Sequence, residues 1–103
     1  MYDIHLIEKS AGYRRAENTT DEWITEGWHV SEDTAKQLIG GTVFLHTLQK
    51  GGCYLGGEIL GYEFITPKRI AIHFRFDKAV VNQIATEGWS QEMLLVKRDE
   101  KAA

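Results

Sequence analysis

The chain has 103 residues, which is room for one domain with one hydrophobic core. Its residues are 43% hydrophobic and 26% charged, which excludes intrinsic disorder, because a disordered chain has few apolar residues and a large net charge. The formal net charge of −3 excludes a basic domain that holds nucleic acid by charge alone. Binding of nucleic acid would therefore need a local basic face or recognition of a base.

The N-terminal residues 1–5 lack a basic segment followed by a long apolar run, so we expect no signal peptide. No apolar run approaches the ~20 residues of a membrane span. We therefore expect a cytoplasmic protein that does not contact a membrane. The single cysteine, Cys53, cannot form an intramolecular disulfide, and we interpret it as a small, half-buried apolar residue.

The N-terminal part of the chain predicts a strand, a loop and a segment of undecided structure. Residues 2–8 alternate between apolar and polar side chains, which is typical of a strand. Residues 9–20 are polar and predict a loop. Residues 21–30 contain Trp23 and Trp28 and fit either a short strand or an irregular buried segment.

A helix is predicted to begin after Ser31, because serine is a good N-cap and Glu32 and Asp33 suit the positive end of the helix dipole. It is predicted to end at Gly40, since glycine readily adopts the left-handed conformation of a C-cap.

Strands are predicted at residues 42–48, 58–65 and 69–76, and the third has the clearest alternation. Its apolar residues share one face and its polar residues share the other, so one face is predicted to be core and the other polar. The apolar residues are Ile70, Ile72, Phe74 and Phe76, and the opposite face carries Arg69, Ala71, His73 and Arg75.

Asp77 is predicted to cap a second helix over about residues 78–86, and residues 93–96 predict a last strand. Residues 97–103 are a charged tail without an apolar anchor. The chain is thus predicted to be a single α+β domain over residues 1–96. It would contain a mostly antiparallel curled sheet, or a small partial β-barrel, of about five strands with two short helices.

Catalytic and metal-binding signals are weak. The chain has four histidines: His5, His29, His46 and His73. None is paired at a spacing of two to four residues and Cys53 has no nearby partner, so we expect no metal site. The glycine-rich residues 51–57 match neither a phosphate loop nor a nucleophile motif and favour a hairpin loop. We expect no cofactor.

The tetrapeptide Thr-Glu-Gly-Trp occurs twice, at residues 25–28 and 86–89. We interpret the two copies as similar corners, in which glycine permits a tight turn and tryptophan closes one end of the core.

Three residues of the clearest strand are candidates for binding. Alternation places Arg69, His73 and Arg75 on one face, where they could hold phosphates. The same face could instead be solvated and paired with acids such as Glu58 and Glu63.

Aromatic residues at the ends of elements are the second set of candidates. These residues could stack on a flipped or single-stranded base, or they could form edges of the core. They are Trp23, Trp28, Tyr54, Tyr62 and Trp89, and the preferred candidates are Trp28 and Trp89, with Tyr54 as a third. The adjacent Arg14 and Arg15 could add to a basic patch or belong to a solvated loop.

Residues 40–46 (GGTVFLH), 56–63 (GGEILGYE) and 69–74 (RIAIHF) resemble the core of the PUA-like superfamily, particularly EVE- and ASCH-type domains. In the second of these segments, Gly57, Ile59 and Gly61 match the family's G-x-I-x-G strand. The resemblance covers roughly residues 23–96. It implies a small β-barrel flanked by helices, with a pocket that reads nucleic acid and often a modified base, but it carries over no binding residue.

The leading hypothesis is a small binding module that recognises RNA, DNA or a modified nucleobase through a basic strand face and an aromatic pocket. The first alternative is a small acidic protein with a protein partner, such as a phage or mobile-element inhibitor of a host system. The second alternative is a small enzyme that uses Cys53 or a histidine.

Overall fold

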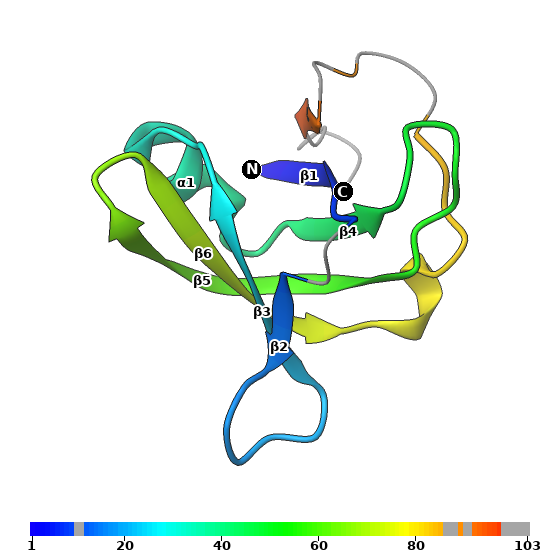
Figure 1. The fold of residues 1–103 in the computed structure, drawn as a ribbon, viewed down its shortest axis with the longest axis horizontal. Helices are drawn as coiled ribbons and strands as arrows, with labels where there is room; N and C mark the ends of the chain where they lie inside the picture. Colours follow the sequence, from blue (N-terminus) through cyan, green and yellow to red (C-terminus); the bar gives the residue numbers. More distant parts are fainter. Residues whose placement is uncertain (10–11, 86–88, 90–91, 98–103) are drawn as a thin grey trace.

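The computed structural model describes residues 1–9, 12–85, 89 and 92–97. Within these residues the chain forms one mixed sheet of seven strands and one α-helix (Figure 1). In chain order the strands are β1 (Tyr2–Ile7), β2 (Tyr13–Arg15), β3 (Glu22–Trp28), β4 (Thr42–His46), β5 (Leu55–Thr66), β6 (Arg69–Phe76) and β7 (Met93–Lys97), with α1 (Glu32–Leu38) between β3 and β4 and a short 3-10 helix, η1 (Lys78–Val80), after β6.

The predicted combination of a sheet with helices is confirmed only in part: among the described residues the sheet has seven strands rather than about five, one α-helix forms rather than two, and the fold is mostly β. The polar segment at 9–20, predicted to be a loop, contains β2, which pairs with β3 in a hairpin. Asn18 adopts a left-handed conformation between these two strands, with φ of 62°. The undecided segment at 21–30 is β3, which lies between β2 and β6.

The prediction of a second helix over 78–86 was wrong. Asp77 does cap the segment, since its side chain accepts a hydrogen bond from the amide of Ala79, but only the single turn η1 forms. The backbone then leaves the helix because Asn82 has φ of 72° and its amide donates to the carbonyl of Cys53. Residue 86 lies outside the described residues.

The first helix is confirmed at both ends. The side chain of Ser31 accepts a hydrogen bond from the amide of Thr34, which makes it the N-cap of α1. After the helix Gly40 has φ of 86°, a left-handed conformation that glycine adopts without steric cost.

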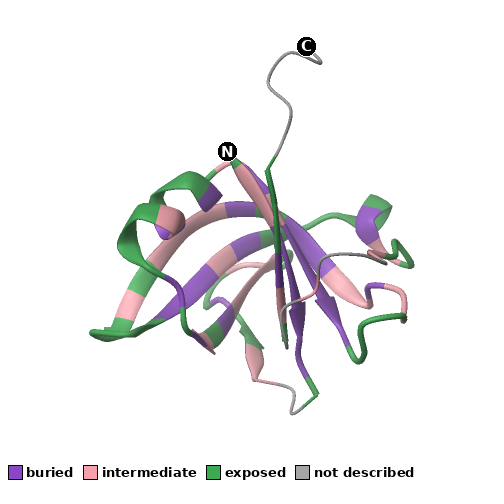
Figure 2. Cartoon of the chain, turned by 90° about the horizontal axis from the view of Figure 1, so that it is seen from above, coloured by how far each residue is buried: buried purple, intermediate pink, exposed green. Residues whose placement is uncertain are grey.

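The strand order is β2-β3-β6-β5-β4-β1-β7, and the sheet is open, with β2 and β7 at its edges. Neighbouring strands are antiparallel except β1 and β4, which are parallel. The sheet curls around one core, as Figure 2 shows from above. Buried residues from both halves of the sheet share that core: Ile4, Leu6, Val43, Leu45, Ile59, Ile70, Ile72 and Phe74, together with Ala35 and Leu38 of α1.

The predicted two faces of β6 are confirmed in part: Phe76, predicted to face the core, is exposed, and Ala71 of the opposite face is buried. Ile70, Ile72 and Phe74 are fully buried, whereas Arg69 and Arg75 are exposed. We call the face of β3, β6 and β5 that carries these arginines the outer face. Strand β7 includes Lys97, the first residue of the predicted tail, and residues 98–103 lie outside the described residues.

No helix in the described part of the chain is both long enough and apolar enough to cross a membrane.

Two glycines of β5, Gly57 and Gly61, differ in how much space surrounds them. A Cβ on Gly57 would lie 1.7 Å from the carbonyl oxygen of Arg75, while one on Gly61 would meet nothing within 4 Å. We expect Gly57→Ala to lower the free energy of unfolding by about 3 kcal/mol or more, because backbone cannot yield as a flexible side chain can. Gly61→Ala, its matched control, should change it by less than about 1 kcal/mol. Urea denaturation followed by circular dichroism measures both, and equal losses would contradict this account of the β5–β6 contact.

Candidate functional site

The three polar residues predicted to bind phosphate all have partners within the protein. Arg69 Nη1 donates to the carbonyl of Gly27 at 2.6 Å. His73 Nε2 lies 2.8 Å from a carboxylate oxygen of Glu22.

Arg75 lies between two acids on the outer face. Its guanidinium is 3.9 Å from the carboxylate of Asp21 and 3.7 Å from that of Glu58. Exposed ion pairs of this kind add little stability, but they cancel the local positive potential. The expectation that Glu58 pairs on this face is therefore met, and the face is not a basic patch.

The predicted aromatic residues lie in three different places. Trp28 is only 8% exposed and belongs to the main core. Its indole N–H donates to the hydroxyl of Thr25 at 2.9 Å, so its polar atom is satisfied inside the protein. A base could not reach this ring unless the core opened.

Tyr54 belongs to a cluster of half-buried rings at the ends of strands. Its ring centroid lies 5.9 Å from that of Tyr13 on β2, which lies 6.0 Å from that of Trp23 on β3. The Tyr54 hydroxyl donates to the carbonyl of Glu8 at 2.9 Å, which ties the cluster to the end of β1. Burial raises the pKa of Tyr54, with smaller contributions from Tyr13, Glu8 and Cys53. We call Tyr13, Trp23 and Tyr54 the aromatic cluster.

Arg15 lies over the aromatic cluster. Its guanidinium carbon is 5.0 Å from the centroid of the Trp23 ring, which is a cation–π contact. Arg15 and Trp23 are opposite each other in the β2–β3 pairing, so the strand register itself produces the contact. Both Arg14 and Arg15 are exposed, and neither is in an ion pair in the part of the chain that is described.

Trp89 lies against two buried histidines. Its ring is edge-on to His5, at a centroid distance of 5.9 Å, and to His46, at 5.5 Å. His5 also stacks on Phe44, with ring centroids 4.2 Å apart and ring planes 6° from parallel. The other members of the repeated tetrapeptide, residues 86–88, lie outside the described residues.

The two histidines form an ordered hydrogen-bonded pair. His46 Nδ1 is 2.8 Å from the carbonyl oxygen of Gly51, and because a carbonyl only accepts, this nitrogen must carry the proton. A neutral His46 then has a lone pair on Nε2, which lies 2.8 Å from His5 Nδ1. His5 Nδ1 therefore donates, and both tautomers are set by the Gly51 carbonyl.

Burial keeps this histidine pair neutral. It lowers the pKa of His5 to about 4, with a further contribution from His46 and an opposing one from Asp3. Burial also lowers the pKa of His46, against the effect of the Gly51 carbonyl.

Cys53 is enclosed beside Phe44 and Val80 and is 1% exposed. Its thiol donates to the carbonyl of Leu55 at 3.2 Å. Burial raises the pKa of this thiol, so it stays protonated at neutral pH, and it has the environment of a packing residue rather than of an activated nucleophile.

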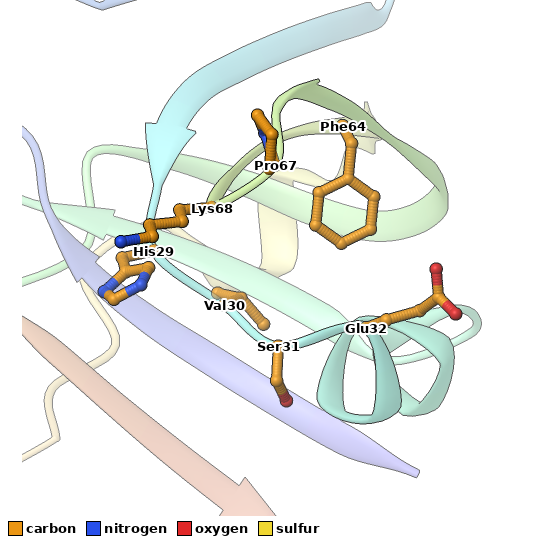
Figure 3. Close-up of a pocket in the computed structure, with 7 residues that line it drawn as sticks. All are labelled: His29, Val30, Ser31, Glu32, Phe64, Pro67 and Lys68. Carbon is orange, nitrogen blue, oxygen red and sulfur yellow. The ribbon is translucent and has the colours of Figure 1, made fainter.

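A hollow of about 650 Å³ lies between the tip of the β5–β6 hairpin and the start of α1 (Figure 3). Lys68 and His29 lie at one side, and the ring of Phe64 and Glu32 lie at the other. Glu32 is itself paired with Lys36, 3.6 Å away, and most of the lining is exposed, so this is an open groove. Among the described residues no group of three potential metal ligands converges.

Sequence reasoning named Trp23 among the possible stacking residues but missed the histidine pair and the part that Tyr13 plays beside Trp23. His5 and His46 are 41 residues apart and meet because β1 and β4 pair in parallel, which no local spacing reveals. The alternation of residues 13–15 and 23–25 would have placed Tyr13 and Trp23 on one face, had the short β2 been expected.

Comparison with protein-family models, curated proteins and solved structures found no match. The resemblance to the PUA-like superfamily thus stays a prediction.

The neutral histidine pair predicts a specific dependence of stability on pH. In the folded chain the pKa of His5 is about 4, below its ordinary value of 6.5. The folded chain therefore binds a proton at His5 more weakly than the unfolded chain does. The contribution of neutral His5 to the free energy of unfolding is therefore fully present above pH 6.5 and is lost as the pH falls toward 4. By pH 5 the protonation of His5 alone should lower the free energy of unfolding by about 2 kcal/mol. Urea denaturation at pH 7.5 and 5.0 measures the loss.

His5→Gln should be less stable at pH 7.5 but should lose less stability on acidification. His29→Gln, which replaces an exposed histidine, is the control and should behave as the original chain. An identical pH-dependent loss in the original chain and in His5→Gln would rule out His5 as the source.

Proposed function

We propose that the chain is a binding module for single-stranded nucleic acid, in which a base stacks at the aromatic cluster beside Arg15. The observation that carries the proposal is the guanidinium of Arg15 lying 5.0 Å from the Trp23 ring centroid, on rings that are only half-buried. Aromatic and guanidinium planes are the groups on which unstacked bases pack, and this stacking does not require a basic protein. A chain with net charge −3 can therefore bind in this way.

Few cationic side chains of the described residues are available to contact phosphates beside the aromatic cluster. Arg69, His73 and Arg75 are held by a carbonyl or by acids, which leaves Arg14 and Arg15 on the edge strand β2 as the cations beside the cluster. Since each neutralised phosphate of a single strand contributes about −0.7 to the slope of log K against log salt, two contacts predict a slope near −1.4. A phosphate-driven site would give a much steeper slope.

The test is fluorescence anisotropy with labelled twelve-nucleotide RNA and DNA, each plain and base-modified, at several salt concentrations. Trp23→Ala should weaken binding by about 5- to 150-fold, the range for loss of one stacked base. Arg15→Ala should weaken it by a smaller factor. Because an exposed cation–π contact is worth only about 0.5–1 kcal/mol, this variant should lower the melting temperature by at most about 8 °C. Lys36→Ala on α1 is the control and should leave affinity unchanged.

Absence of binding at high micromolar protein and low salt would refute the proposal. A slope steeper than about −3 would also refute it, because phosphate contacts would then dominate. Preference for a modified base would identify the ligand more narrowly, and equal binding of all four probes would identify a general single-strand binder.

A further inference from the structure

The outer face carries a small hollow that the proposed function does not use. Its volume is about 240 Å³, and its lining includes Ile24 of β3, Ala71 of β6, and Leu60 and Gly61 of β5. The hollow exists because small residues occupy its floor: a Cβ on Gly61 would meet nothing within 4 Å, and Ala71 has only a methyl group. This volume is below the 300–1,000 Å³ typical of small-molecule sites and suits a single side chain.

Two glutamates flank the floor of this hollow. Ala71 pairs with Glu26 on one side and with Glu63 on the other, so the three residues form a row across β3, β6 and β5. Adjacent strands lie about 4.8 Å apart, which puts the two glutamate backbones about 10 Å apart on either side of the methyl group. A cation above Ala71 would be within reach of both carboxylates.

These two glutamates differ from the other acids of the outer face. Asp21, Glu22 and Glu58 are paired with Arg75 or His73, whereas the side chains of Glu26 and Glu63 form no hydrogen bond or ion pair with another described residue. Arg14 also lines the hollow, but it lies on β2, beyond β3, and three strands away from Glu63. The lining therefore holds two carboxylates against one guanidinium, that of Arg14, and also includes the imidazole of His73, so carboxylates outnumber guanidinium groups there.

We propose that this hollow docks a lysine or arginine side chain of a partner protein. The cationic head would lie above Ala71, between Glu26 and Glu63. The aliphatic stem would run past Gly61 and His73, between Ile24 and Leu60. Such long side chains bury their stems on apolar surface while keeping the charge at polar groups. Ile65, which also lines the hollow and is 47% exposed, offers an apolar contact for the partner's neighbouring residue. The excess of carboxylates makes this face unsuited to phosphate, so the surface is separate from the aromatic cluster.

The test is a titration of the ¹⁵N-labelled protein with two acetylated, amidated pentapeptides, Ala-Leu-Arg-Leu-Ala and Ala-Leu-Gln-Leu-Ala, followed by NMR. The arginine peptide should shift the amide signals of Ile24, Gly61 and Ala71 in a saturable way, and the glutamine peptide should not. Shifts of equal size with both peptides, or no saturable shift with either, would overturn the proposal.

Variants separate shape from charge. Gly61→Leu fills the hollow in open space, and the double variant Glu26→Gln with Glu63→Gln removes the charge, so each should weaken arginine-peptide binding at least fivefold. Glu17→Gln, at an exposed acid away from the hollow, is the control and should not weaken it. Undiminished binding by either test variant, with melting temperatures unchanged, would contradict the assignment.

The same variants distinguish this surface from the proposed nucleic-acid site. The double glutamine variant should bind the twelve-nucleotide probes as the original chain does, and Trp23→Ala should bind the arginine peptide as the original chain does. Competition between the peptide and the nucleic acid for the hollow would overturn the inference that a protein side chain is its occupant.

Discussion

The curl of the sheet depends on backbone packed directly against backbone at the start of β5. A Cβ on Gly56 would lie 2.2 Å from the carbonyl of Val43 on β4, and one on Gly57 would lie 1.7 Å from that of Arg75 on β6. With no side chain at either position, β5 can pair with β4 and β6 at once where the sheet bends. This bend lets strands from both halves enclose one core, so every surface described above depends on it.

The curl also separates two kinds of chemistry that a flat sheet would have mixed. The inner face ends in half-buried rings, where Tyr13 of β2 contacts Tyr54, the residue just before β5. The outer face keeps its charged side chains in solvent, where Glu22 of β3 contacts His73 of β6 and Glu58 of β5 contacts Arg75 of β6. The sequence of β6 suggests a basic patch, but acidic side chains of the neighbouring strands offset its positive charge. The cations next to the aromatic rings come instead from β2.

The buried histidine pair is the other polar feature that the fold controls. Leaving either imidazole unpaired in the core would be costly, and the parallel pairing of β1 with β4 aligns them so that each has a partner. The carbonyl of Gly51 completes the chain of hydrogen bonds from the glycine-rich loop. That loop therefore orders two core residues, a role distinct from the hairpin turn that its composition indicates.

Much of the local structure follows from the sequence alone. Capping at Ser31, the left-handed turn at Gly40, and the two faces of β6 depend on neighbours within a few residues, so periodicity and turn chemistry predict them. The short strand β2, the loss of the second helix, and the contacts of His5 and Trp23 depend on partners far along the chain. Only tertiary structure decides such features, because backbone hydrogen bonds and the pairing of charges are settled by which strands become neighbours. Composition by itself established a small domain that cannot bind by net positive charge, and the fold decided which aromatic and charged residues meet.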